Sequence, residues 1–215
     1  MIRILIADDH AIVRGGLKQL LSGQSDFIVA GEAANGLEAL KQIREQPFDV
    51  ALMDMSMPGR SGIELIKLIK AEKPRLAIMV LSMHKEEQYA VRALKAGALG
   101  YLTKESAPDQ LVAAIRKVAS GGAFISSGVA ERLALELGGN HEADPHTLLS
   151  DREYQIFRMI VLGMPIGVIA GELSLSVKTV STHKTRILQK MRMASSAELI
   201  HYAIRHQLVE SPSDS

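Results

Sequence analysis

Acidic side chains stand at the ends of two short apolar runs in the N-terminal part of the chain. Asp8 and Asp9 follow the run Ile2–Ala7, and Asp54 follows the run Val50–Met53. If the two runs are neighbouring strands of a parallel sheet, the three carboxylates meet at its carboxyl edge, where ligands of open α/β sheets bind. Because like charges this close repel, a cation is expected among them, and oxygen-only ligands favour Mg²⁺. Asp54 is then a candidate nucleophile towards a phosphorus atom.

Two further polar side chains occupy the same position after later apolar runs. Ser82 follows Ala77–Leu81, and Lys104 follows Gly100–Thr103. A serine hydroxyl and a lysine ammonium can both donate hydrogen bonds to phosphoryl oxygens. Taken alone, each residue is an ordinary loop serine or a solvated lysine. Polar residues at the ends of four different apolar runs favour a phosphate-handling site over that simpler interpretation.

The elements that must position these residues follow from hydrophobic periodicity. Short apolar runs bounded by Gly, Pro or charged residues are predicted strands: Ile2–Ala7, Phe27–Ala33, Val50–Met53, Ala77–Leu81 and Gly100–Thr103. Amphipathic helical patterns alternate with them: Ala11–Ser22, Gly36–Gln46, Gly62–Glu72, Glu86–Ala96 and Pro108–Ser120. Such units in series predict an α/β fold of the flavodoxin-like (βα)5 kind, a parallel five-stranded sheet with helices on both faces.

The alternating pattern stops at Gly121–Gly122. One more short helix, Val129–Leu137, and a polar stretch, Gly138–His146, then precede a region with helical periodicity only. The predicted divisions, in chain order, are an α/β domain (1–121), a linker with a short helix (122–148), a separate all-α four-helix domain (149–209) and a disordered tail (210–215).

Composition narrows the class of protein. The 215 residues include no cysteine, which excludes disulfides and thiolate metal sites, and no apolar run of bilayer-spanning length. Two aspartates within the first nine residues argue against a signal peptide. We therefore expect a cytoplasmic protein with no membrane partner. Residues 150–209 carry eight Lys and Arg against four Asp and Glu, which favours a nucleic-acid partner at this end.

The C-terminal helices carry a helix-turn-helix pattern. They are predicted at Asp151–Leu162, Ile166–Leu173, Val177–Met191 and Ser196–His206. A capping box of Ser150 and Glu153 precedes the first, and Ser176 suits the N-cap of the third. On the third helix, the residues expected to face the core are Val177, Val180, Ile187 and Leu188. The outward residues are then Lys178, Ser181, Thr182, Lys184, Thr185 and Arg186. This face suits double-stranded DNA, although an ordinary solvated basic face shows the same pattern.

The first 120 residues resemble a known family at four motifs. IADDH, LMDMSMPGRSG, VLSMH and GYLTKES are similar, in order and spacing, to the receiver domain of two-component response regulators. The resemblance implies that Asp54 accepts a phosphoryl group from a sensor histidine kinase. The alternative is an enzyme, such as a haloacid-dehalogenase-type phosphatase. Such a phosphatase requires a second aspartate two residues after the nucleophile, where this chain has Ser56. We therefore expect no enzyme beyond phosphoryl acceptance and slow self-dephosphorylation.

The same resemblance implies a role for each remaining residue of the site. The protein ligands of Mg²⁺ in the family correspond to Asp9, Asp54 and the backbone carbonyl of Ser56, with Asp8 acting through water. The phosphoryl-binding lysine, the switch hydroxyl and the switch aromatic correspond to Lys104, Ser82 and Tyr101. The chain departs from many receivers in carrying Glu105 instead of proline after Lys104, and the geometry of that peptide bond stays open.

Residues 149–208 resemble the four-helix DNA-binding domain of NarL/FixJ (LuxR-type) regulators, most clearly at LSLSVKTVSTHKTRILQKM. The resemblance implies base or phosphate contacts by Lys178, Ser181, Thr182, Thr185 and Arg186. It also implies a two-fold contact through the last helix, where Leu199, Tyr202 and Ala203 are expected to be exposed. A transcription regulator whose phosphorylation promotes homodimerisation and promoter binding is the function implied.

The chain departs from this family in the scaffold helix. Many relatives have Asn-Lys-Glu at the start of the scaffold helix, whereas this chain has Ile166–Gly167–Val168. The change removes a lysine that could contact phosphate and places a glycine in a helix, at a cost of up to about 1 kcal/mol relative to Ala. A C-terminal domain that docks on another protein is the alternative to DNA binding, and the salt dependence of binding to random duplex separates the two functions.

Overall fold

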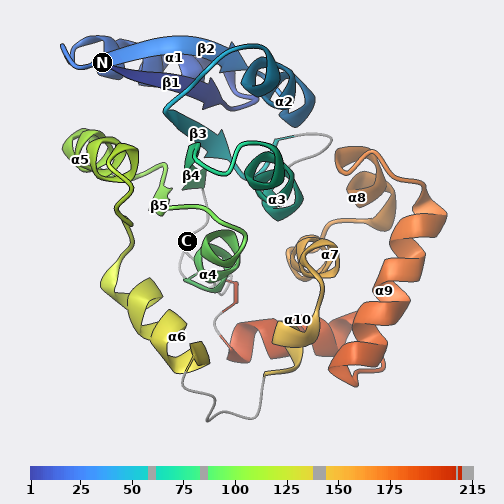
Figure 1. The fold of residues 1–215 in the computed structure, drawn as a ribbon. Helices are drawn as coiled ribbons and strands as arrows, with labels where there is room; N and C mark the ends of the chain where they lie inside the picture. The colour runs from blue at the N-terminus through green and yellow to red at the C-terminus, as the bar shows by residue number, and fades with distance from the viewer. Residues whose placement is uncertain (58–61, 83–86, 138–143, 207, 210–215) are drawn as a thin grey trace. The chain divides into compact units, whose positions relative to one another are not determined.

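The computed structural model describes residues 1–57, 62–82, 87–137, 144–206 and 208–209. The chain divides into two compact units, Met1–Leu137 and Gly138–Ser215 (Figure 1). Buried apolar side chains form a separate core in each unit. The two units are therefore described one at a time.

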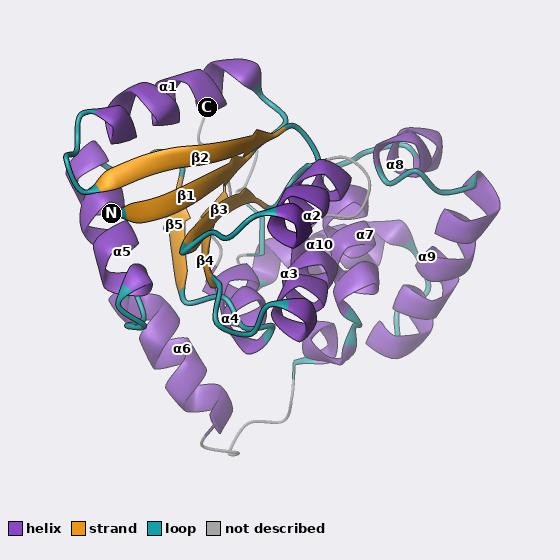
Figure 2. Cartoon of the chain, turned by 45° about the horizontal axis from the view of Figure 1, so that its top comes forward, coloured by secondary structure: helices purple, strands orange, loops and turns teal. Residues whose placement is uncertain are grey.

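The first unit contains the predicted parallel five-stranded sheet, with strand order β2-β1-β3-β4-β5 (Figure 2). Its strands are β1 (Ile2–Ala7), β2 (Phe27–Ala33), β3 (Val50–Asp54), β4 (Ala77–Ser82) and β5 (Gly100–Thr103). The strand pairs β1–β3 and β3–β4 have a continuous register. Ala7 of β1 lies opposite Met53 of β3, and Asp54 of β3 lies opposite Leu81 of β4. All the strands point the same way, so the residues that follow them gather at one edge.

Helices cover both faces of this sheet. The helices of this unit are α1 (Ala11–Ser22), α2 (Gly36–Glu45), α3 (Gly62–Glu72), α4 (Glu87–Lys95), α5 (Pro108–Ala119) and α6 (Ser127–Leu137). Figure 2 shows α1 and α5 on one face and α2, α3 and α4 on the other. The Asn35 side chain caps α2 by accepting from the N–H of Glu38, and Pro108 opens α5, where its missing N–H costs nothing.

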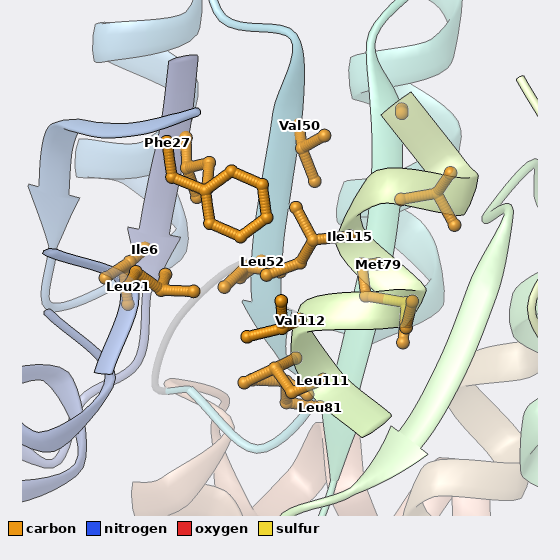
Figure 3. Packing of buried hydrophobic residues seen from close by; sticks show 14 residues of the cluster. Ile6, Leu21, Phe27, Val50, Leu52, Met79, Leu81, Leu111, Val112 and Ile115 are labelled. Atoms are coloured by element: carbon orange, nitrogen blue, oxygen red, sulfur yellow. The ribbon is translucent and has the colours of Figure 1, made fainter. Parts of the chain in front are cut away.

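The core under α1 and α5 holds the strands in place (Figure 3). Alternate residues of the central strands, among them Leu52 and Met79, pack there against Leu21 of α1 and Ile115 of α5. Every residue of β3 is buried, as expected for a central parallel strand covered on both faces. Close packing of this kind transmits strain rather than absorbing it. The strand ends that carry the polar residues are therefore fixed relative to one another.

The second unit is all-helical over its described residues. Its elements are a 3₁₀ turn η1 (Pro145–Leu148) and the helices α7 (Asp151–Val161), α8 (Ile166–Glu172), α9 (Val177–Met191) and α10 (Ser196–Arg205). The predicted capping box is present, because the Ser150 hydroxyl accepts from the N–H of Glu153 while the Glu153 carboxylate accepts from the N–H of Ser150. The turn between α8 and α9 passes through Ser174 in the left-handed conformation (φ 51°). Tyr154 and Phe157 of α7 lie at the centre of the core.

The structure differs from the sequence-based expectations in the connector. The helix predicted there is α6, which packs against α4 and belongs to the first unit. The 3₁₀ turn contains His146, whose side chain is buried although the sequence placed it in a polar linker. Residues 138–143 of that linker, the expected helix start at Glu86 and the tail 210–215 lie outside the described residues.

The predicted burial of one side chain of α9 is wrong. Val177 was expected in the core, but it is 55% exposed. Val180 and Ile187 are buried as expected, and Leu188 is half-buried. The first residue of a helix has no preceding turn to cover it, so helical spacing alone does not decide its burial.

Among the described residues, no helix is both long enough and apolar enough to cross a bilayer.

Candidate functional site

The strand order of the sheet brings Asp8, Asp54 and Lys104 together. β1 and β3 are neighbours in register, so the carboxylates at their ends lie side by side. Lys104 follows β5, and its backbone N–H donates to the carbonyl of Ser82 at the end of β4, with a nitrogen–oxygen distance of 2.8 Å. The lysine side chain must therefore extend across the end of β4 to meet the two carboxylates.

The Lys104 ammonium pairs with both carboxylates. Its Nζ lies 2.6 Å from Oδ2 of Asp8 and 3.0 Å from Oδ2 of Asp54. The lysine side chain is 9% exposed and the two carboxylates are buried. Burying two like charges is costly without a partner, and Lys104 supplies one. Apart from these ion pairs, neither Oδ2 atom has a hydrogen-bond donor among the described residues, so both oxygens keep unused capacity to bind a cation.

The electrostatics of the site suit a nucleophilic carboxylate. Burial raises the pKa of the Asp54 carboxyl above its ordinary value, and the opposing effect of Lys104 does not cancel it. Burial by itself would lower the pKa of Lys104, but hydrogen bonds to Asp8 and Asp54 outweigh it and raise that pKa. The ammonium therefore stays protonated at neutral pH. A poorly solvated carboxylate beside a fixed positive charge can attack an anionic phosphorus group.

Asp9 and His10 extend the acidic edge. One ligand atom each from Asp8, Asp9, His10 and Asp54 all lie within 4.8 Å of one another. Oδ1 of Asp9 is also buried without a hydrogen-bond donor in the described part of the chain, and lies 3.0 Å from Nδ1 of His10. Mg²⁺ binds oxygen ligands at about 2.0–2.1 Å in octahedral geometry, so carboxylate oxygens this close together fit it. The sequence argument overlooked His10, although its position directly after two aspartates was a signal.

The remaining predicted residues of this site are Ser56, Ser82 and Tyr101. The backbone N–H of Ser56 donates to Oδ1 of Asp54 (3.2 Å), which orients the carboxylate. Ser82 and Tyr101 lie on the adjoining strands β4 and β5, and both side chains are buried. Residues 58–61 and 83–84, which belong to two of the family motifs, lie outside the described residues. No peptide bond in the described ranges is cis, so the bond between Lys104 and Glu105 is trans.

The outward face of α9 is largely as predicted. Its exposed residues include Lys178, Thr182, Thr185 and Arg186, while Ser181 and Lys184 are half-buried. The Ser176 side chain caps the helix by accepting from the N–H of Thr179 (3.0 Å). Val180, Ile187 and Met191 bury the opposite face, which fixes the helix against the rest of the unit.

The predicted exposure of α10 is wrong for two of three residues. Leu199 and Ala203 are 0% exposed. Tyr202 is half-buried, and its hydroxyl oxygen lies 2.6 Å from Nδ1 of His146. These side chains therefore hold α10 against its own unit. The exposed residues of α10 are instead Ala197, Glu198, His201, Ile204 and Arg205. Apolar spacing marks one face of a helix but does not say whether that face meets its own core or a second subunit.

Two family models match the chain. Residues 4–116 match the response regulator receiver domain, and residues 147–203 match the bacterial regulatory proteins of the luxR family. The first match includes Asp8, Asp9, Asp54, Ser82 and Lys104. The second covers α7, α8 and α9 together with most of α10.

Whole proteins are similar along almost their full length. The response regulator UvrY of Escherichia coli (strain K12) is 40% identical over 209 residues, which are 97% of this chain and 96% of UvrY. A structure of RcsB from Salmonella enterica serovar Typhimurium, bound to promoter P1flhDC with the phosphomimetic BeF₃⁻, is 28% identical with a TM-score of 0.68 and covers 95% of this chain and 98% of that one. A structure of two RcsB dimers on two parallel DNAs is 28% identical with a TM-score of 0.59, covering 94% and 96%.

These matches and the geometry agree on the class of protein. The α/β unit carries the acidic edge that a receiver needs, and the helical unit carries a capped helix with an outward polar face. The chain is a two-component response regulator of the NarL/FixJ family, a DNA-binding transcription regulator with a receiver domain and a LuxR-type helix-turn-helix domain.

Proposed function

We propose that Asp54 accepts a phosphoryl group from a sensor histidine kinase in the presence of Mg²⁺, and that phosphorylation promotes homodimerisation and promoter binding. One observation carries the proposal: Lys104 Nζ lies within 3.0 Å of oxygens of both Asp8 and Asp54, at the carboxyl edge of a parallel sheet. Groups from three different strands meet there, and Asp54 is the nucleophile among them. A purely structural ion pair would need only one acidic partner for the lysine.

The chemical step is the transfer of a phosphoryl group between two side chains. A carboxylate oxygen of Asp54 attacks the phosphorus of a phosphohistidine on the kinase, and the phosphorus–nitrogen bond breaks. The electron pair of that bond stays on the imidazole nitrogen, which then takes up a proton. The product on this chain is an acyl phosphate. Lys104, which already lies beside the Asp54 carboxylate, can pair with the transferred group and stabilise its charge.

The acidic edge supplies the ligands for the metal. Asp9, Asp54 and the backbone carbonyl of Ser56 would hold Mg²⁺, with Asp8 acting through a water molecule, and His10 lies beside them. When bound, Mg²⁺ screens the charge of the phosphoryl oxygens so that an anionic nucleophile can approach. Buried oxygens of Asp9 and Asp54 belong to this cluster, beside Nδ1 of His10 and Nζ of Lys104. The single ammonium leaves excess negative charge on the three carboxylates, which supports a cation at this place.

Hydrolysis of the aspartyl phosphate, which releases inorganic phosphate, is expected to be slow. Hydrolysis of the acyl phosphate needs a group that activates water near the phosphorus. The position two residues after Asp54 is Ser56, which offers no carboxylate for that task. We therefore propose self-dephosphorylation without a dedicated base, and a role in signalling rather than in metabolism.

Ser82 and Tyr101 are the proposed switch. Ser82 ends β4 beside Asp54, and Tyr101 lies on β5, with both side chains buried. A hydroxyl drawn towards a new phosphoryl group would vacate volume in a close-packed region, which a neighbouring side chain must fill. The two residues are therefore placed to pass the change from Asp54 to the surface of the receiver.

Promoter binding is proposed for the outward face of α9. Lys178, Ser181, Thr182, Lys184, Thr185 and Arg186 form this face. RcsB, which is similar along 95% of this chain, has been captured on promoter DNA with a phosphomimetic and as dimers on DNA. A dimer of this chain would present two α9 helices to paired half-sites of double-stranded DNA. We propose a cytoplasmic location, which a double-stranded DNA target supports.

Phosphoryl acceptance can be tested by intact-protein mass spectrometry. The full-length protein is incubated with acetyl phosphate, with Mg²⁺ or with EDTA. We expect the mass of one phosphoryl group to be added only with Mg²⁺, and none to be added in Asp54→Asn. Asp109→Asn, which changes an exposed aspartate at the start of α5, is the matched control and should be labelled like the wild type. Unchanged labelling of Asp54→Asn would overturn the assignment.

A further inference from the structure

His10 directs its imidazole at the acidic edge and leaves the helix that it precedes without a side-chain cap. It is the N-cap residue of α1, a position usually held by Ser, Thr, Asp or Asn, whose side chains accept from the first N–H groups of a helix. The His10 side chain makes no such hydrogen bond. Its backbone N–H donates to Oδ1 of Asp8 (2.9 Å), which fixes the residue beside that carboxylate. The ring is therefore available to a different partner.

Two carboxylate oxygens lie next to this imidazole. Nδ1 of His10 is 3.0 Å from Oδ1 of Asp9 and 3.3 Å from Oδ1 of Asp8. Lys104 contacts the other oxygen of Asp8, Oδ2, at 2.6 Å. The ammonium and the imidazole thus approach Asp8 through different oxygens. The lysine therefore leaves Oδ1 of Asp8, together with Oδ1 of Asp9 and the ring nitrogen, for a different cation.

The separations of these atoms suit ligands of one ion. Divalent metals of this size bind carboxylate oxygen or imidazole nitrogen at about 2.0–2.2 Å. Two such ligands lie about 3.0 Å apart when they occupy adjacent corners of an octahedron. The distances from Nδ1 of His10 to the oxygens of Asp8 and Asp9 are close to this value, and a ligand atom of Asp54 lies within 4.8 Å of all three. His10 is therefore placed to be a ligand of the same ion as the carboxylates.

A nitrogen ligand changes which metal ions a site prefers. Mg²⁺ takes oxygen ligands and keeps several waters, so an imidazole adds little to its binding. Fe²⁺, Ni²⁺, Cu²⁺ and Zn²⁺ bind imidazole well. The His10 side chain is 63% exposed, so its ring can turn towards an ion without disturbing the packed core. Its contribution to binding should therefore depend on the kind of ion.

We infer that His10 is a metal ligand of the acidic edge, and that its imidazole strengthens the binding of nitrogen-accepting first-row transition-metal ions but not that of Mg²⁺. The inference rests on the proposed metal-dependent phosphoryl acceptance at Asp54, and it names a further ligand and the class of ion that this ligand selects. The carboxylates supply the negative charge that every divalent cation needs, and His10 supplies the selectivity. In the alternative, His10 is an imidazolium that pairs with Asp8 and Asp9 and competes with all cations.

The test compares Ni²⁺ with Mg²⁺ on the full-length protein. Isothermal titration calorimetry at about pH 8, which favours the neutral imidazole that metals require, gives the affinity of each ion for the wild type and for His10→Ala. We expect His10→Ala to bind Ni²⁺ at least about tenfold more weakly, because the loss of a mere outer partner of a ligand already costs about 10–100-fold. Its affinity for Mg²⁺ should stay within about threefold of the wild-type value, since Mg²⁺ replaces the missing ligand by water.

Proton NMR of the Ni²⁺ complex detects the nitrogen ligand directly. A histidine bound through one ring nitrogen keeps a proton on the other, and paramagnetic Ni²⁺ shifts the signal of that N–H proton far outside the usual range. We expect an exchangeable signal of this kind in the wild type that His10→Ala lacks. His201→Ala, which removes an exposed histidine of α10, is the matched control and should keep both the signal and the affinity. Asp9→Asn should weaken the binding of both ions, because both use its carboxylate.

The outcomes distinguish this inference from the proposed function. If His10→Ala binds Ni²⁺ as tightly as the wild type, or loses affinity for both ions by the same factor, the inference is wrong and the proposed magnesium site stands. Tighter binding of both ions to His10→Ala would show that the imidazole competes with cations, which overturns the inference in the same way. Affinities for both ions that Asp9→Asn leaves unchanged would overturn the proposed metal site and the inference together.

Discussion

Lys104 and Asp54 form an ion pair, with Nζ 3.0 Å from Oδ2, although they belong to the ends of two strands that are separated by β4. The same ammonium lies 2.6 Å from Asp8, so a single lysine pairs with two buried carboxylates. This arrangement makes the three residues energetically interdependent. The effect of changing one of them should therefore depend on which of the others remain.

Replacing Lys104 by methionine should destabilise the receiver by about 3 kcal/mol, because two buried carboxylates then lack their cation. Adding Asp54→Asn to this variant should recover part of that loss, since only one buried carboxylate remains. The measurement is urea unfolding without Mg²⁺. Hydrogen–deuterium exchange mass spectrometry of peptides from the first unit monitors the unfolding. A double variant no more stable than Lys104→Met would show that repulsion between the carboxylates is unimportant.

Mg²⁺ should raise the melting temperature of the receiver, because a ligand that binds only the folded state stabilises it. At a concentration one hundred times the Kd, the gain is about 2.7 kcal/mol. Asp9→Asn should lose most of this stabilisation, since Asp9 contributes a buried oxygen to the proposed site. Differential scanning calorimetry with and without Mg²⁺ measures the effect, with Asp109→Asn as the control. Equal stabilisation of Asp9→Asn and the wild type would remove Asp9 from the ligand set.

The stability of the helical unit should depend on pH through Glu153. This carboxylate is buried, but hydrogen bonds from Lys190 (2.6 Å) and the N–H of Ser150 (2.8 Å) outweigh the effect of burial and lower its pKa. A pKa that is lower in the folded state gives stability that is present above the unfolded value of 4.5 and is lost as the pH falls through the folded value.

Glu153→Gln should therefore destabilise the helical unit at pH 7 by about 1.5–3 kcal/mol, the range for hydrogen bonds to a charged group. The difference from the wild type should shrink as the pH falls below the unfolded pKa. Urea unfolding at several pH values, read from exchange of α7 and α9 peptides, reports this unit alone. A difference that stays constant down to acidic pH would show that the charge of Glu153 is not the cause.

Lys184→Ala and Arg186→Ala should weaken DNA binding to all sequences by similar factors. Each side chain is expected to contact a phosphate, so each variant should also reduce the slope of log affinity against log salt by about 1. Fluorescence anisotropy with specific and random duplexes over a salt series measures both effects. Lys41→Ala removes an exposed lysine of the first unit and serves as the control. Variants with native circular dichroism and unchanged affinity would exclude this face as the DNA interface.

The burial of α10 residues separates folding from dimerisation. Leu199 is fully buried, so Leu199→Ala should destabilise the helical unit by about 2–5 kcal/mol. Ile204 is 38% exposed, so Ile204→Glu should leave the fold intact and weaken the phosphorylated dimer if α10 forms the contact. Analytical ultracentrifugation with phosphodonor and DNA measures the second effect. A monomeric but fully stable Leu199→Ala would contradict the assignment of this side chain to the core.

Much of the receiver was accessible from the sequence. The prediction agrees residue for residue with the observed bounds of β1, β2, β5, α1 and α3. The reason is that each apolar or amphipathic stretch has the length of a strand or helix and ends at charged or turn residues. Parallel strands share one carboxyl edge, so the spacing of Asp8, Asp54, Ser82 and Lys104 was enough to predict that they gather there. This reasoning is local at each strand end and needs no knowledge of packing.

Tertiary structure decided what periodicity leaves open. Leu199 and Ala203 of α10, and Val177 of α9, each have helical spacing to other apolar residues of their own helix. Leu199 and Ala203 are nevertheless buried, while Val177 is on the surface. His146 belongs to a polar stretch of sequence but is buried against Tyr202. The reason is that a spacing of three and four residues defines a face of one helix, while burial depends on which other element covers that face. The lysine bridge between Asp8 and Asp54 likewise depends on the order of β1, β3, β4 and β5 in the sheet, which brings together groups far apart in the chain.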